Sequence, residues 1–258
     1  MMVQLVERVG DRVIGGLAHV GGVVMMLARI ISTLPKLPRS LGLTVDQMMA
    51  MGVNSLPLVA ITSAFTGMVA SVQTAYQFRD YTPMVLLGSA VGKMVLIELG
   101  PVLTALVVAG RVGASIAAEL GTMKVTEQID ALETLAVDPI RYLALPRFVS
   151  GMIMLPVLVI MADVIAILGG MFVAVFAVGV SAETFTRGLR LYFQFRDVFG
   201  GLFKAVIFGM IIAVMGCYQG FNAGWGAGGV GRATTRAVVY SCLLILIFDY
   251  VVAELVFR

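Results

Sequence analysis

The amino-acid sequence predicts an all-α integral membrane protein, and two observations lead to this fold class. Hydrophobic residues make up 60% of the 258 residues and charged residues only 13%, whereas a soluble domain carries about 25% charged residues. The apolar residues also gather in stretches of about 20 or more, the length that a helix needs to cross a bilayer. The chain has room for five or six such helices and for no sizeable soluble domain. The net charge of +3 is too small to indicate binding to nucleic acid.

Residues 1–31 have the pattern of an amphipathic helix that lies in the membrane interface. Polar residues recur at spacings of three and four, and valine and leucine fill the opposite side. The apolar run from Val13 to Ala28 is short for a span and rich in glycine, which favours an interfacial position. A signal peptide is the alternative, but the acidic residues and the lack of an A-x-A cleavage site argue against it. The polar set consists of Gln4, Glu7, Arg8, Asp11 and Arg12.

Five apolar stretches predict membrane spans within a single domain. They cover residues 52–76, 84–123, 148–180, 200–219 and 234–257. The second stretch is longer than a bilayer requires, so we expect it to bend at Gly100-Pro101 or to extend beyond the membrane. Residues 181–199 are amphipathic and too charged to span, which predicts a short helix between the third and fourth spans. A polar turn at 77–83 and a glycine-rich turn at 220–231 connect other spans.

Lysine and arginine residues near the span ends predict the orientation of the chain. With the N-terminus inside, the cytoplasmic side carries most of these positive charges. The cytoplasmic set is Arg8, Arg12, Arg29, Lys36, Arg39, Arg111, Lys124, Arg141, Arg147, Arg232 and Arg236, and the outer set is Arg79, Arg187, Arg190, Arg196 and Arg258. The segment between spans two and three is then cytoplasmic, and the amphipathic segment at 181–199 lies outside.

The segment TEQIDALETLAVDP, residues 126–139, is acidic and interrupts the apolar chain between spans two and three. Thr126 can cap a helix there, and acidic residues in the first turn suit the positive end of the helix dipole. The predicted helix, 126–137, has an apolar face with Ile129, Leu132, Leu135 and Ala136, and an acidic face with Glu127, Asp130 and Glu133. This pattern fits a partner with basic residues and an apolar groove, or a solvated loop helix without a partner. The pattern alone leaves both open.

Several motifs argue against other classes of protein. His19 is the only histidine, which excludes metal sites built on histidine and a Ser-His-Asp triad. Cys217 and Cys242 lie in apolar runs and are expected to pack as small hydrophobic residues. The glycines of GAGGVG, residues 226–231, fit G-x-G-x-x-G, but that fingerprint needs a preceding strand. We therefore expect no catalytic residue, no metal and no nucleotide site in this chain.

Two segments of the chain carry a resemblance to a known family. ELGPVLTALVVAGRVGASIAAELGTMKVTEQIDALETLAVDPIRYLALPR (98–147) and GVGRATTRAVV (229–239) closely resemble the MlaE/YrbE permeases of Mla- and Mce-type lipid ABC transporters. The resemblance implies an interfacial helix followed by five spans, which agrees with the count from hydropathy. It also implies that the acidic segment is the coupling helix that docks into an ATPase subunit. That role falls to Glu127, Gln128, Ile129, Asp130, Ala131, Leu132 and Glu133.

The resemblance also implies a function and a set of partners. The chain would be the permease of a homodimeric transporter that moves phospholipid between inner and outer membranes, with ATP and Mg²⁺ bound by a separate MlaF-like ATPase. An MCE-domain substrate-binding protein (MlaD-like) would cap an outer cavity between the two copies, and a small STAS-domain protein (MlaB-like) is a further expected partner. The expected location is the bacterial inner membrane with the N-terminus in the cytoplasm, and the chloroplast inner envelope is the alternative.

Charged residues inside the predicted spans are expected to be paired or functional, because each costs about 3 kcal/mol or more at a helix centre. They are Lys93, Glu98, Asp163, Lys204, Asp249 and Glu254. We expect Lys93, Glu98, Lys204 and Asp249 to form a cluster that borders the lipid path, with Lys93 and Asp249 paired because they lie at similar depth. Lys93 would also replace an arginine that relatives carry where this chain has Ile97. The alternative is that these charges only hold spans two, four and five together.

Two other classes of function remain as alternatives. A proton-coupled secondary transporter of a hydrophobic substrate could use Glu98, Asp163 and Asp249 as proton carriers. The sequence shows no internal repeat, which argues against many such transporters, and the acidic helix would have no role in one. A scaffold that only anchors partners would tolerate neutralisation of the charges within the spans.

Overall fold

The computed structural model describes residues 2–78 and 83–257, and the side chains of residues 14–38, 40–78 and 83–256. All regular structure in these residues is helical, which confirms the predicted all-α class. By length and composition, six of the described segments are long and apolar enough to cross a membrane. They are Ile14–Pro38, Leu41–Phe78, Met84–Val125, Ile140–Val178, Phe195–Phe221 and Gly226–Val256.

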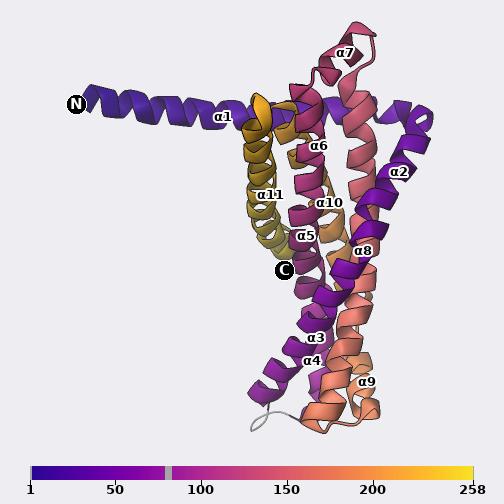
Figure 1. The fold of residues 1–258 in the computed structure, drawn as a ribbon. Helices are drawn as coiled ribbons and strands as arrows, with labels where there is room; N and C mark the ends of the chain where they lie inside the picture. Colours follow the sequence, from indigo (N-terminus) through magenta and orange to yellow (C-terminus); the bar gives the residue numbers. More distant parts are fainter. Residues whose placement is uncertain (1, 79–82, 258) are drawn as a thin grey trace.

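The first helix, α1 (Met2–Thr33), lies across one end of the molecule, whereas the other long helices form a bundle along a common direction (Figure 1). The 3-10 helix η1 (Leu34–Ser40) then turns the chain into the bundle. His19 holds α1 against the bundle, because its Nε2 atom lies 3.1 Å from Nε2 of Gln219 and its ring packs edge-on against Tyr218.

The crossing direction of α1 is the one that an interfacial helix takes relative to spans. Its segment Ile14–Pro38 is nevertheless long and apolar enough to span by composition, so the interfacial role stays a prediction. The side chains of the predicted polar face at residues 4–12 lie outside the described side chains, and residues 79–82 of the predicted turn at 77–83 lie outside the described residues.

The bundle begins with α2 (Leu41–Met51) and α3 (Leu56–Phe78), which run away from α1 and are linked by the short η2 (Val53–Ser55). The segment Met84–Val125 then returns as one long rod of helical turns. Its parts are η3 (Met84–Leu86), α4 (Leu87–Met94), η4 (Val95–Leu99), α5 (Gly100–Val108), η5 (Ala109–Gly113) and α6 (Ala114–Val125). At about 1.5 Å per residue this rod is about twice as long as the hydrocarbon core of a bilayer is thick.

Wide π-helical turns precede two of the prolines in the bundle. The turn η4 comes directly before Gly100 and Pro101, and the turn η6 (Ile140–Ala144) comes before Pro146. In a regular α-helix the proline ring would collide with the carbonyl group four residues earlier. A π turn moves that carbonyl group away, so the rod continues through Pro101 as a helix.

The second half of the bundle consists of three long helices and one short helix. After η6, α8 (Leu145–Val173) and η7 (Ala174–Val178) run away from the α1 end, and α9 (Ala182–Leu191) lies at the opposite end (Figure 1). Two antiparallel helices, α10 (Phe195–Phe221) and α11 (Gly226–Phe257), complete the fold. The short helix predicted within residues 181–199 is thus present as α9.

The predicted glycine-rich turn at 220–231 is wrong in its extent, since only residues 222–225 separate α10 from α11. Glycines 226, 228, 229 and 231 instead form the first turns of α11. A side chain at Gly229 would overlap the backbone of Gly224, so close packing of the turn on the helix explains this glycine. The G-x-G-x-x-G pattern therefore starts a helix that follows another helix, without the strand that a nucleotide fold requires.

Close contacts between small residues set the helix positions. A Cβ atom at Gly67 on α3 would overlap the carbonyl oxygen of Ala166 on α8, and one at Gly209 on α10 would overlap that of Gly151 on α8. A Cβ atom at Gly88 on α4 would likewise overlap the carbonyl oxygen of Phe185 on α9. Without a hydrophobic driving force between helices in lipid, such backbone approach provides the packing energy.

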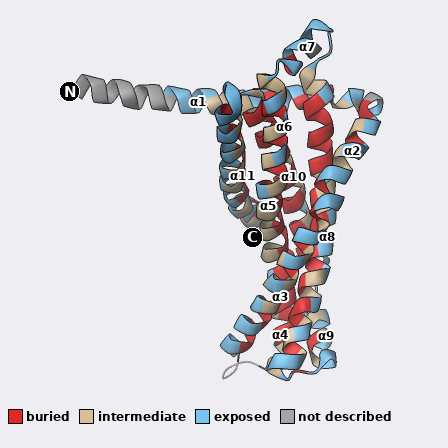
Figure 2. Ribbon diagram, viewed as in Figure 1, coloured by how far each residue is buried: buried red, intermediate tan, exposed pale blue. Residues whose placement is uncertain are grey.

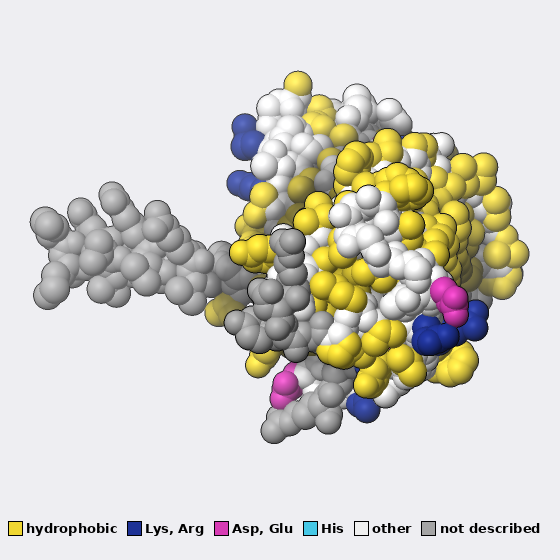
Figure 3. Space-filling view, turned by 90° about the horizontal axis from the view of Figure 1, so that it is seen from below, with side chains coloured by type: hydrophobic (Ala, Val, Ile, Leu, Met, Phe, Trp, Pro, Cys, Tyr) yellow, Lys and Arg dark blue, Asp and Glu magenta, His cyan; other side chains and the backbone are white. Residues whose placement is uncertain are grey.

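The rod and α10 form the centre of the bundle, and the other helices surround them. Buried residues make up 56% of the most apolar window in both Met84–Val125 and Phe195–Phe221, against 22% in Gly226–Val256. Figure 2 shows the buried residues on the inner faces and exposed residues along the outer face of α11. Seen from the end opposite α7, hydrophobic side chains cover much of the described surface, with few charged groups (Figure 3). Exposed hydrophobic side chains also line the sides of α3, α8 and α11, so the lateral surface suits contact with lipid.

Candidate functional site

The acidic segment forms a short helix, α7 (Gln128–Thr134), that projects beyond the end of the bundle where α1 lies (Figure 1). Among the described residues, Glu127 and Ala136 are the two non-glycine residues with positive φ, at 59° and 57°. They stand directly before α7 and two residues after it. This conformation costs about 1–2 kcal/mol for a residue with a side chain, so the surrounding contacts hold both reversals of the chain in place.

A Schellman motif ends α7. The N–H of Ala136 donates to the carbonyl of Glu133 at 3.0 Å, and that of Val137 donates to the carbonyl of Leu132 at 2.9 Å. These bonds satisfy two carbonyl groups that a helix end would otherwise leave open. The helix is therefore shorter than the predicted 126–137.

The prediction that Thr126 caps α7 is wrong. Its hydroxyl donates to the carbonyl of Thr122 at 2.9 Å, so Thr126 completes α6 instead. Glu127 occupies the N-cap position without a side-chain hydrogen bond to the helix. The reason lies in the left-handed conformation of Glu127, which places the chain reversal one residue later than the sequence pattern indicates.

The two faces of α7 differ in their contacts. Ile129 is 4% exposed and belongs to the hydrophobic core, and Leu132 packs against the same core. Leu135 is 73% exposed and Ala136 is exposed, so the predicted apolar face is correct for its first half only. The remaining predicted coupling residues are all exposed: Glu127, Gln128, Asp130, Ala131 and Glu133.

An ion pair between a buried arginine and a half-exposed glutamate lies beneath α7 and joins the helices on either side of it. The Arg147 side chain on α8 is almost fully buried and contacts Oε1 of Glu119 on α6 at 2.8 Å. Arg147 also donates to the carbonyl of Leu143 at 2.7 Å. Sequence reasoning missed the pairing of Glu119 and Arg147, because both residues stand near span ends where unpaired surface charges are common.

The second site is a cluster of three charged side chains within the spans, which we call the Lys204 triad. Lys204 on α10 has no exposed surface, and its ammonium group contacts Oε2 of Glu98 at 2.6 Å and Oδ1 of Asp249 at 2.7 Å. The side chain of Glu98 is 46% exposed and that of Asp249 is 13% exposed. A fully buried ammonium group needs such partners, since removal of a charge from water costs several kcal/mol.

The structure brings together three of the four predicted cluster residues and separates the fourth. Lys93 pairs with Asp197 at 3.4 Å rather than with Asp249, so the expected Lys93–Asp249 pair is wrong. The reason is the course of α10, which runs beside the rod and places Asp197 next to α4. The helix α11 packs against α5, η5, α6 and α10. Depth counted from span ends did not reveal these neighbours.

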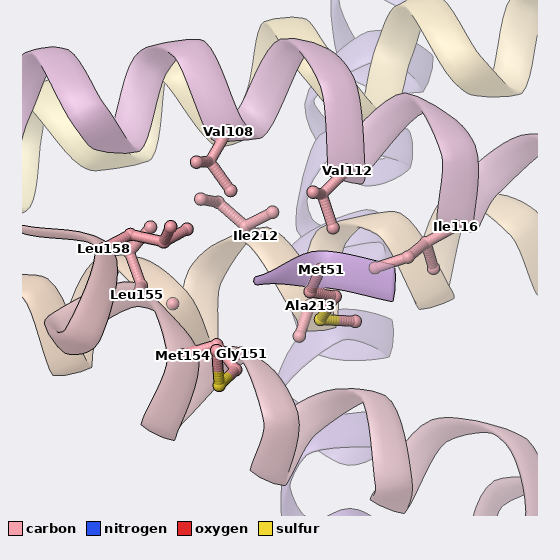
Figure 4. A pocket seen from close by; sticks show the side chains of 11 residues that line it. Met51, Val108, Val112, Ile116, Gly151, Met154, Leu155, Leu158, Ile212 and Ala213 are labelled. Carbon is pink, nitrogen blue, oxygen red and sulfur yellow. The ribbon is translucent and has the colours of Figure 1, made fainter. Parts of the chain in front are cut away.

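A gap inside the bundle is too small to hold a lipid. Its volume is about 10 Å³, which is near the lower limit for a single water molecule. Figure 4 shows only apolar side chains around it, drawn from α2, the rod, α8 and α10. Its lining includes Met51, Val112, Met154, Leu158 and Ile212. A lipid therefore has no place in this gap.

The described residues contain no group of three His, Cys, Asp or Glu side chains that could hold a metal ion. Cys217 is buried and Cys242 is partly buried, and both are free thiols.

The helical bundle, the charged triad between its spans and the helix that projects at one end together define a multi-pass membrane transport subunit. The chain belongs to the MlaE permease family, since the family described as "Permease MlaE" matches residues 44–255. This confirms the resemblance noted in the sequence. The matched region includes α7 and the Lys204 triad.

Relatives from bacteria and a plant resemble the chain over most of its length. A probable ABC transporter permease protein of Rickettsia typhi is 43% identical over the full length of both chains. The intermembrane phospholipid transport system permease protein MlaE of Haemophilus influenzae is 35% identical over all of this chain and 99% of its own. Protein TRIGALACTOSYLDIACYLGLYCEROL 1, chloroplastic, of Arabidopsis thaliana is 36% identical over 83% of this chain and 61% of its own.

Proposed function

We propose that this chain is the permease subunit of an ABC transporter that moves phospholipid between the inner and outer membranes of a bacterium. The names of the Rickettsia and Haemophilus relatives, a probable ABC transporter permease and an intermembrane phospholipid transport permease, support the proposal. A separate MlaF-like ATPase hydrolyses ATP and binds Mg²⁺, so this chain is not itself an enzyme and binds no cofactor.

The observation that carries the proposal is the position of α7. Its apolar face reaches the core through Ile129, and its exposed face carries Asp130 and Glu133 away from the bundle. Glu119 and Arg147 tie together the helices that flank it. A force applied to α7 by an ATPase is therefore passed to α6 and α8 rather than absorbed by a loose loop.

The lipid lies between two copies of the chain in this proposal. The interior gap of one copy is too small, whereas the outer face of α11 is apolar and exposed. Glu98 of the Lys204 triad is half exposed and borders the lipid path. ATP binding brings two ATPases together, moves both α7 helices and reshapes the cavity between the copies.

The further partners and the location follow from the same proposal. The protein resides in the inner membrane with α7 and the N-terminus in the cytoplasm. An MlaD-like MCE protein caps the cavity on the outer side, and an MlaB-like STAS protein assists the ATPase.

Charge reversal on α7 tests the coupling role. The variant Glu133→Lys places a positive charge on the exposed face of α7, and we expect it to lose co-purification with the ATPase and ATP-dependent lipid movement between vesicles. The variant Asp46→Lys is the matched control, because Asp46 is an exposed carboxylate on α2 outside the projecting helix. A reconstituted wild-type complex without ATP-dependent lipid movement would refute the proposed function.

One observation favours a proton-coupled transporter as the second candidate. Asp163 on α8 is buried, and its Oδ1 atom has no hydrogen-bond partner among the described residues. Glu98 and Asp249 are bound to Lys204 and are thus not free carriers. Purification and a transport assay decide between the candidates. If no ATPase co-purifies with the chain and transport needs a proton gradient, Asp163 is favoured as a proton carrier.

A further inference from the structure

The first turns of α11 line an open pocket that the proposed function does not use. Its volume is about 390 Å³, and its walls are Gly228, Gly231, Arg232, Thr235 and Arg236. All five residues are exposed. Neither arginine forms a hydrogen bond or an ion pair with any other residue that the structure describes.

The pocket attracts anions for two reasons. Arg232 and Arg236 stand one helical turn apart, so their positive charges repel each other unless an anion lies between them. The free N–H groups in the first turn of α11 add to the positive potential. Gly228 and Gly231 have no side chains that would cover the backbone, so a phosphate group can approach closely.

The two arginines lie at the level of lipid headgroups. From Arg236 to Val256, α11 continues for about 20 residues, or about 30 Å, which is the thickness of the hydrocarbon core. Val230, just before the arginines, packs against Gly121 near the end of α6. The first turns of α11, which line the pocket, lie at the α7 end of the bundle (Figure 1).

The same face of α11 is apolar beyond the arginines. Spacings of three and four lead from Arg236 to a row of exposed hydrophobic side chains that continues along the helix. This row consists of Val239, Leu243, Leu246 and Tyr250. One helix face thus combines a cationic end with an apolar remainder, which matches a ligand with an anionic head and acyl chains.

We propose that this pocket binds the phosphate of an anionic phospholipid from the leaflet at the α7 end, with the acyl chains along the exposed face of α11. The pocket would hold the headgroup where a lipid enters or leaves the transporter. That transport role rests on the proposed function, whereas lipid binding itself requires neither ATP nor the ATPase.

The single tryptophan of the chain reports on the pocket. Trp225 is 79% exposed and lies in the turn directly before α11. We would purify the full chain in detergent micelles and titrate it with phosphatidylglycerol brominated near the glycerol end of its acyl chains. Bound lipid should quench the fluorescence of Trp225. Because each arginine near a membrane surface strengthens anionic lipid binding about fivefold, the half-quenching concentration should rise about 30-fold in the double variant R232Q/R236Q.

Matched variants separate binding from folding. R232K/R236K retains both charges, and its half-quenching concentration of lipid should lie within about threefold of that of the wild type. R190Q removes an exposed arginine from α9 at the opposite end of the bundle and should leave the half-quenching concentration unchanged. If R232Q/R236Q fails to fold, the wild type alone still gives an answer, because high salt should weaken binding of phosphatidylglycerol but not of brominated phosphatidylcholine.

Three results would overturn the inference. These are equal quenching by phosphatidylglycerol and phosphatidylcholine at low salt, displacement of the lipid by micromolar inorganic phosphate, and loss of quenching when the ATPase is added. The second result would indicate a soluble anion as the ligand, and the third an acidic surface of the ATPase. None of them concerns ATP-dependent lipid movement, so failure of this inference and failure of the proposed function are distinguishable.

Discussion

Removal of the buried ammonium group in the Lys204 triad should destabilise the bundle strongly. In the variant Lys204→Met, Glu98 and Asp249 lose the cation that both contact within 2.7 Å. Without the ammonium group that both contact, these two carboxylates repel each other. Loss of one partner from a buried charge pair costs about 3–5 kcal/mol in other proteins. We therefore expect a loss of about 3–5 kcal/mol in the free energy of unfolding.

The assay is unfolding of the purified chain by SDS in mixed micelles. The variant Lys124→Met is the control, because the pair of Lys124 and Asp130 is exposed and should contribute less than about 1 kcal/mol. The triple variant K204M/E98Q/D249N should recover most of the lost stability, since it leaves no unpaired charge. If Lys204→Met is as stable as the wild type, or the triple variant no better than the single one, the electrostatic reasoning fails.

The remaining predictions concern helix packing and the anchoring of α7. Gly67→Ala should lower the free energy of unfolding by about 1–3 kcal/mol, because the added methyl group overlaps the carbonyl oxygen of Ala166. The same SDS titration measures this loss. The control is Gly42→Ala, which has open space around it and should be neutral or slightly stabilising. Ile129→Ala should release α7 from the core at a cost of about 2–5 kcal/mol, seen as faster hydrogen exchange of residues 128–134, whereas Leu135→Ala, at an exposed position, should leave exchange unchanged. Equal exchange in both α7 variants would contradict the docking of Ile129.

The helical structure of the acidic segment could be predicted because a local pattern sufficed. The acidic segment is a helix because its apolar and acidic residues alternate with helical spacing, and its exposed carboxylates lie where that spacing indicates. The boundaries of α7 were harder to predict. Glu127 and Ala136 adopt a left-handed conformation that no propensity rule assigns to glutamate or alanine.

Pairings between distant residues were beyond the sequence. The pair of Lys93 and Asp249 was expected because both residues lie at a similar depth in the membrane. Depth does not determine which face of a helix points toward which neighbouring helix. Asp197 became the partner of Lys93 because α10 runs beside the rod. The pairing of Glu119 with Arg147 was not predicted, because only the folded bundle brings the side chains of α6 and α8 together beneath α7.

The sequence by itself determined the membrane class, the helical content, the approximate positions of the long helices and the short helix that became α7. These features depend on transfer of apolar segments into lipid and on backbone hydrogen bonds within a segment, and both are local properties of the chain. Only the tertiary structure decided the partners of the buried charges and the open face of α11 with its two arginines. Those outcomes depend on helix rotations and offsets, which are set by backbone contacts between residues far apart in the sequence, such as that of Gly67 with Ala166.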